Sequence, residues 1–495
     1  MRKWAGLGIV WLWIVVLFAT HWGDRSPYSY GWAIFHGHSA RLLGTVVNPD
    51  AVVVYPVTLF FYDGETPRNW GDSPNFRLPF HSFVAATAAA FTRSYLLAND
   101  LVNVGALCLL ALVAVNAARL YKLRTGAVLL ALLTIASLPF VVTYIGQPMH
   151  YIVGITINFL AVIAAVALSE DDLRKPLLSG LLLAIVMLNY DAYIFAAALA
   201  VYILFFVRFR RVADYAIFIV VSVTPVVVWV EFLRFLTGDR VSRMIQRTFI
   251  EPIVYAWTEF LKHPLTYPLQ PFLAAHVGLD MTWHFVLAMV YWPIVVVIVA
   301  GTWYFRREIP PGRLTLMIAL LLSAFFLHQV VTAGYDWENN PRRAVPAVFA
   351  LACVYCWLAD RLWPRKAWRA VLIAVLLISG TLAMADVVFD TPVITYLSTG
   401  QAAQSNPKEP ITIQFMRFNQ ATMPTLMSDE RRVWRDLGRA RWPERNVVLP
   451  FLFAQFFNAF FCCALLWLLS RARLLSRHAA AIAAIVWLLS AVRFI

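Results

Sequence analysis

A lone carboxylate follows the first long apolar stretch of the chain. Asp24 stands in the run from Gly23 to Tyr28, directly after an apolar segment that ends near His21. If that segment spans a membrane, Asp24 and Tyr28 lie at the mouth of any cavity between helices, where a lipid-borne substrate presents its head group. The alternative interpretation is that they are solvated loop residues.

A second polar group leads back toward the next apolar stretch. Asp72 precedes Arg77 and His81, which belong to the run Arg-Leu-Pro-Phe-His. These side chains are candidates for substrate binding, with a solvated loop as the alternative. His36 and His38 with nearby acids could hold a cation, but the His-x-x-x-His or Asp-x-Asp spacing of metal sites is missing. We therefore expect no metal.

Two adjacent arginines, Arg342 and Arg343, precede a late apolar stretch. A guanidinium presents a planar fork that matches phosphate oxygens, so the pair could bind a lipid phosphate at the membrane interface. The alternative is an anchor to head groups. Asn158 and Asp191 lie within or beside apolar stretches. An ionisable group at membrane depth is by default a functional candidate, although Asp191 could instead lie in a solvated turn.

The composition identifies the elements that must position these residues. The chain has 495 residues, of which 61% are hydrophobic and 14% charged, with a mean hydropathy of +0.69. Soluble domains are roughly a quarter charged, so a soluble enzyme is excluded. Because every lipid-facing backbone group must be satisfied within its own helix, the pattern predicts an all-α, polytopic membrane protein. The net charge of +14 lies mostly between apolar stretches, where it sets orientation, and we expect no nucleic-acid partner.

Apolar stretches of spanning length predict about thirteen transmembrane helices. Two of them form a hairpin within Leu177 to Val207, whose 31 residues would measure about 46 Å as one helix, too long for one span. The others lie at about Trp4 to His21, Asn99 to Ala117, Gly126 to Tyr144, Met149 to Leu168, Tyr215 to Phe232, Phe285 to Tyr304, Leu314 to Val331, Ala344 to Ala359, Val371 to Val388, Leu449 to Leu469 and Ala479 to Ala491.

Alternating sides from a cytoplasmic N-terminus places the short basic turns inside, as the positive-inside rule requires. These clusters lie near residues 119–124, 174–175, 208–211, 306–313, 361–369 and 471–477. Four substantial segments remain on the outer face, at about 22–97, 233–283, 332–343 and 391–448. Long loops without a core of their own are usually functional, so the chemistry is expected there.

This layout resembles the GT-C superfamily of integral-membrane glycosyltransferases. The resemblance is carried by Asp24 after the first span, by Tyr28, by the stretch containing Arg77, Pro79 and His81, by the short hairpin, and by Arg342 and Arg343 before Pro346. It covers residues 1–362 as a catalytic module, and residues 363–495 would add C-terminal helices with the outer loop. The chain departs from the family pattern because Arg25, and no second acid, follows Asp24.

The resemblance implies transfer of a sugar from a polyprenyl-phosphate donor to a glycan, lipid or protein acceptor. Asp24 would act as general base, while Arg342, Arg343, Arg77, His81, Asp72, Tyr28 and Asp191 would bind substrate, without a metal or other cofactor. The site would face the periplasm from a bacterial inner membrane, in contact with membrane lipids. Two alternatives stay open: an O-antigen ligase or polymerase-like enzyme, and a lipid or solute transporter or flippase.

Overall fold

The computed structural model describes residues 2–20, 84, 88, 95–137, 141, 145, 151–189, 192–237, 251–264, 297–323, 345–389 and 448–493. Within those residues the fold is all-α, with no strand, which confirms the predicted class. The helices are α1 (Arg2–Thr20), α7 (Tyr95–Leu120), α8 (Thr125–Ala136), α10 (Tyr151–Ala167), α11 (Glu170–Leu173), α12 (Pro176–Met187), α13 (Ala192–Val201), the π-helix η1 (Tyr202–Val207), α14 (Val212–Thr237), α16 (Glu251–Lys262), α19 (Pro311–Leu322), α21 (Val345–Leu362), α22 (Lys366–Phe389), α25 (Val448–Arg471) and α26 (Arg477–Arg493), with a further helical stretch at 297–305.

Helix α10 lies at the centre of the bundle. Its side chains from Ile152 to Val162 are all buried, and it contacts α7, α12, α13, α21 and α25. Helix α22 packs on α8 and α1, while α25 packs on α10 and α12. The two predicted modules, 1–362 and 363–495, therefore share one hydrophobic core. Whether their functions divide at residue 362 stays a prediction.

The predicted hairpin is confirmed by the ends of its two arms. The Arg174 side chain, just before α12, donates from Nε to the carbonyl oxygen of Val207, the last residue of η1, at 3.4 Å. One continuous helix would hold these two residues apart by about 50 Å. Gly180 allows α12 to approach α14, because a Cβ there would lie 2.7 Å from Val221 Cβ.

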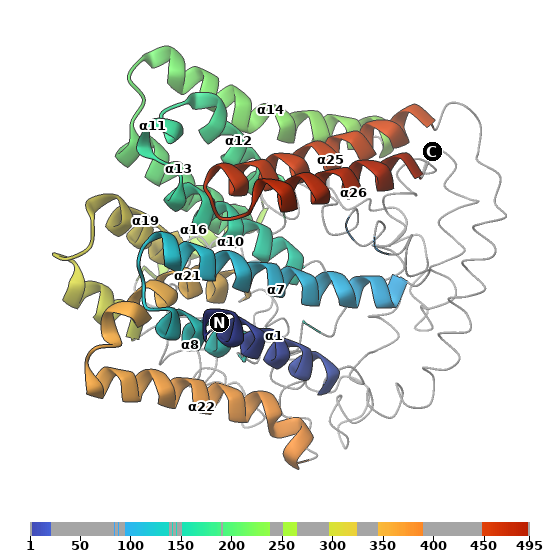
Figure 1. Ribbon diagram of the computed structural model, residues 1–495. Helices are drawn as coiled ribbons and strands as arrows, with labels where there is room; N and C mark the ends of the chain where they lie inside the picture. Colours follow the sequence, from blue (N-terminus) through green and yellow to red (C-terminus); the bar gives the residue numbers. More distant parts are fainter. Residues whose placement is uncertain are drawn as a thin grey trace.

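Six short turns gather at one end of the bundle, which we call the turn end; they comprise residues 121–124, 168–175, 208–211, 306–310, 363–365 and 472–476. Figure 1 shows them together on the left. Side chains join them in pairs: Arg124 to Asp360, Asp172 to Arg471, and Arg174 to Val207. The predicted gathering of basic clusters on one side is thus confirmed.

A layer of arginines stacked on aromatic rings also marks the turn end. Such cation–π contacts are stabilising, and membrane proteins enrich aromatic residues at the water interface. Within the described chain the pairs, with distances from guanidinium carbon to ring centroid, are Arg119–Trp4 (5.1 Å), Arg306–Trp303 (4.1 Å), Arg313–Tyr121 (4.3 Å), Arg361–Trp357 (5.5 Å), Arg365–Tyr304 (4.5 Å), Arg365–Phe305 (5.2 Å), Arg369–Trp363 (5.3 Å) and Arg471–Trp467 (5.6 Å).

By length and composition, 2 of the described helices can cross a membrane, at Leu101–Leu120 and Val212–Phe232. Several other apolar helices of the described chain are shorter, such as Thr125–Ala136 and Pro176–Met187. A helix of 12 residues measures about 18 Å, well short of a hydrocarbon core of about 30 Å. The total of thirteen spans therefore stays a prediction.

Candidate functional site

Of the residues that the sequence singled out for chemistry, the structure describes Asn158, and the proposed catalytic and binding residues fall outside the described part of the chain. They are Asp24, Tyr28, Asp72, Arg77, His81, Asp191, Arg342 and Arg343. Their assigned roles stay predictions. The structure does describe the helix ends that flank them.

Helix α1 runs away from the turn end. Its start lies there, since the Arg119 guanidinium near the end of α7 sits over the ring of Trp4. The 19 residues of α1 carry the chain about 28 Å to Thr20, four residues before Asp24. Helix α7 returns from Tyr95 to the turn end. The segment 21–94 therefore joins the bundle at the end opposite the turns, which we call the far end.

Helix α21 shows that the segment with Arg342 and Arg343 also joins the bundle at the far end. Its C-terminal turn holds Asp360, which contacts Arg124 at the turn end, and its 18 residues extend about 27 Å from there back to Val345. Arg342 and Arg343 immediately precede this helix. Both α1 and α21 pack on α8, so the two flanking helices share one neighbour.

A buried pair of amides lies at the tip of the hairpin, two residues before Asp191. Asn189 Nδ2 donates to Asn158 Oδ1 at 3.1 Å and also to the carbonyl oxygen of Gly154. Both asparagines are buried. A polar pair inside an apolar bundle fixes the tip of α12 against α10, because separating the groups would leave them unsatisfied.

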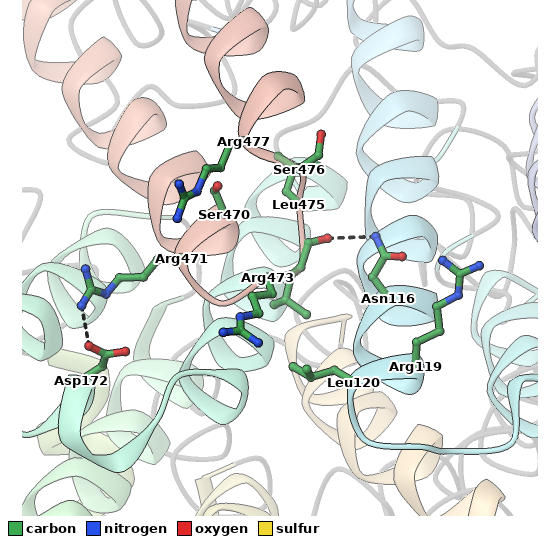
Figure 2. A pocket seen from close by; sticks show the side chains of 11 residues that line it. Asn116, Arg119, Leu120, Asp172, Ser470, Arg471, Arg473, Leu475, Ser476 and Arg477 are labelled. Atoms are coloured by element: carbon green, nitrogen blue, oxygen red, sulfur yellow. Dashed lines mark hydrogen bonds and ion pairs between the residues drawn. The ribbon is translucent and has the colours of Figure 1, made fainter.

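A polar hollow lies at the turn end of the described structure, and we call it the turn pocket. It has a volume of about 930 Å³. Figure 2 shows that its side chains come from the end of α7, from α11, and from the α25–α26 turn. It is lined by Asn116, Arg119, Leu120, Asp172, Ser470, Arg471, Arg473, Leu474, Leu475, Ser476 and Arg477.

One carboxylate and one amide hold the turn pocket together. Asp172 Oδ1 lies 2.6 Å from Arg471 Nη2 and 3.0 Å from Lys175 Nζ. The hydrogen bond from Arg471 is the main reason that the pKa of Asp172 falls to about 2. Asn116 Nδ2 donates to the carbonyl oxygen of Leu474 at 3.0 Å, which ties α7 to the α25–α26 turn.

The pocket leaves three cations uncompensated. Arg119, Arg473 and Arg477 have no acidic partner among the described residues, while Asp172 is already engaged by Arg471. The arrangement favours binding of an anion, and guanidinium groups suit phosphate oxygens. No three metal-ligating side chains of the described chain cluster closely enough to hold a metal ion.

Sequence reasoning interpreted these arginines only as signals of orientation. The pocket can be recognised only from tertiary contacts, because its hydrogen-bonded partners Asn116 and Leu474 are 358 residues apart in the sequence. Comparison with known proteins adds no further guide, since no family model, no curated protein and no solved structure matches this chain.

Proposed function

We propose that this chain is a membrane glycosyltransferase, which moves a sugar from a polyprenyl-phosphate donor to an acceptor on the outer face of a bacterial inner membrane. One observation carries the proposal. The segments that contain Asp24 and the Arg342–Arg343 pair attach to helix ends about a membrane thickness from the basic turns.

The basic turns support a cytoplasmic turn end. Short loops rich in arginine and lysine stay on the cytoplasmic side of a membrane. The far end then faces the periplasm, together with the attachment points of all the candidate catalytic residues except Asp191. Completing the bundle to about thirteen spans belongs to the same proposal.

The proposed chemistry needs one base and one anion-stabilising group. An acceptor hydroxyl oxygen attacks the anomeric carbon of the sugar as Asp24 takes its proton. The bond between that carbon and the phosphate oxygen breaks, and its electron pair leaves with the polyprenyl phosphate. Arg342 and Arg343 stabilise the charge that develops on the leaving phosphate. Tyr28, Asp72, Arg77, His81 and Asp191 contribute to binding donor and acceptor.

Labelled polyprenyl-phosphate sugars test this assignment directly. Purified full-length protein is incubated with a panel of such donors, and transfer and hydrolysis products are separated and counted. Loss of a general base lowers rates by about 10²- to 10⁴-fold, which is the expected effect of Asp24→Asn. Asp171→Asn is the matched control, because Asp171 is an exposed acid on α11 at the turn end.

Three outcomes would count against the proposal. An absence of product with every donor removes the enzymatic function. Unchanged activity in Asp24→Asn, with loss in Arg342→Gln, favours a ligase or polymerase that takes diphosphate-linked oligosaccharides. Movement of substrate across proteoliposomes without a covalent product favours a transporter or flippase.

A further inference from the structure

Arg473 occupies a backbone position that normally selects glycine. Its φ is 60°, in the left-handed region. Helix α25 ends in a Schellman motif, with Leu474 N bonded to Leu469 O at 2.9 Å and Arg473 N bonded to Ser470 O at 3.0 Å. The left-handed residue of this motif is usually glycine, because a Cβ is strained there. The motif fixes the backbone of Arg473 at the edge of the turn pocket, which its side chain lines.

Arg477 also occupies a position that is electrostatically unfavourable for a cation. It is the first residue of α26, whose N-terminal end carries a positive partial charge that disfavours cations. Ser476 caps this helix, since its Oγ accepts from Ala479 N at 3.1 Å. The capped helix end and the Arg477 guanidinium therefore add their positive potentials at the same cavity.

The positive-inside rule does not explain why Arg473 and Arg477 lie at the same cavity in locally unfavourable positions. The positive-inside rule depends on how many basic residues a turn holds, not on their backbone conformation. Lys122 provides the internal comparison. It ends α7 in the same Schellman motif, with φ 54°, Leu123 N bonded to Ala118 O at 2.7 Å and Lys122 N bonded to Arg119 O at 3.1 Å, yet it does not line the pocket.

We propose that the turn pocket binds a phosphate-bearing anion through Arg473 and Arg477, with Arg119, which stacks on Trp4, at its edge. A phosphate oxygen that accepts from these groups offsets the unfavourable charge at the start of α26 and gives the strained Arg473 a partner. The ligand is either the head group of an anionic phospholipid in the leaflet at the turn end or a soluble phosphate compound. This site lies at the opposite end of the bundle from the proposed glycosyl transfer and does not depend on it.

Binding is measured on the full chain purified in a non-ionic detergent. Pyrophosphate is titrated by calorimetry, and phosphatidylglycerol is titrated by native mass spectrometry with phosphatidylcholine as the uncharged comparison. Saturable binding of pyrophosphate identifies a soluble source. Retention of phosphatidylglycerol alone identifies a lipid head group. Either result supports the site, and failure of both ligands to bind at millimolar concentration overturns it.

Two glycine variants distinguish specific binding in the turn pocket from general attraction to the positive charge of the turn end. Arg473→Gly keeps the left-handed turn and removes one guanidinium, so we expect about tenfold weaker binding. Lys122→Gly removes one charge from the same end of the bundle and from the same backbone position. We expect its affinity to stay within about twofold of the wild type, because screening weakens charges outside the pocket. Equal losses in the two variants would reduce the site to general attraction and overturn the proposal.

A third variant should strengthen binding. Asp172→Asn removes the carboxylate that engages Arg471, which leaves Arg471, Arg473 and Arg477 lining the cavity without an acid. We expect affinity for the same ligand to rise by about threefold to tenfold. Weaker binding in this variant, with a melting temperature equal to that of the wild type, would contradict the assignment, because loss of an acid from an intact pocket should strengthen anion binding. The melting temperature of each variant, recorded without ligand, identifies any that fail to fold.

Discussion

Two turns of this protein share one backbone design and differ in what faces them. The turns after α7 and α25 both place a basic residue, Lys122 or Arg473, in the left-handed position of a Schellman motif, and a leucine follows each. The first turn is closed by Asp360 of α21. The second opens onto the turn pocket, where Asp172 binds Arg471 from the side.

The difference shows that tertiary neighbours decide the role of such a turn. Asp360 is buried, and its Oδ1 accepts from the Arg124 backbone N–H at 2.7 Å, while Arg124 Nη1 donates to the Asp360 carbonyl oxygen at 3.0 Å. The Asp172 carboxylate is more exposed, and it contacts only the side chains of Arg471 and Lys175. We therefore expect the first junction to contribute mainly stability and the second mainly recognition.

Removing Asp360 should give the largest effect. Asp360→Ala leaves the Arg124 backbone N–H without its acceptor, which costs about 1–3 kcal/mol of unfolding free energy. The Arg124 side chain is exposed, so losing its acid adds little to this cost. Denaturant unfolding in detergent, followed by tryptophan fluorescence, measures the change. Asp171→Ala, an exposed acid at the same end, is the control, and an equal loss in both variants would contradict the special place of Asp360.

The Asp172 junction should contribute less and should depend on pH. Its pKa of about 2 lies below the ordinary value near 3.9, so pairing with Arg471 stabilises the fold fully above about pH 4. The contribution is lost as the pH falls from about 4 through 2. For a partly exposed pair we expect about 1 kcal/mol. Wild type and Asp172→Asn should differ in melting temperature at pH 6 and converge near pH 2. A constant difference across this range would rule out titration of Asp172 as the cause.

The two glycine variants should give the smallest change in stability and the sharpest comparison. Glycine relieves left-handed strain but adds entropy to the unfolded chain, so Lys122→Gly and Arg473→Gly should each raise the unfolding free energy by between zero and about 1 kcal/mol. Their stabilities should match while their affinities for pyrophosphate or phosphatidylglycerol differ. If Arg473→Gly proves clearly destabilising, the arginine holds the turn together by itself.

Much of the fold could be predicted from periodicity and charge. The apolar stretch at about Met149 to Leu168 forms the helix Tyr151–Ala167, and the hairpin follows from basic residues at both ends of one overlong stretch. These features are local, so a single sequence reveals them. Asp360 could not be identified in this way, because its acceptor role depends on Arg124, which lies 236 residues away.

The two candidate sites differ in the same way, since one can be selected from the sequence and the other only from the structure. Asp24, Arg342 and Arg343 could be selected from residue type and place along the chain, and they stay predictions. The turn pocket could not be predicted from the sequence, because its arginines resemble every other basic cluster of the chain. Only the meeting of α7, α11 and the α25–α26 turn distinguishes Arg473 from Lys122.

The arginine–aromatic layer at the turn end also provides an optical marker. Its exposed indoles, Trp4, Trp303 and Trp467, lie at one level of the bundle beside their arginines. If the protein spans a membrane as proposed, a water-soluble collisional quencher confined to one compartment of sealed vesicles reaches this level from one side only. The chain has 19 tryptophans, so the difference in quenching between wild type and a variant with these three changed to phenylalanine reports which way the molecule is inserted.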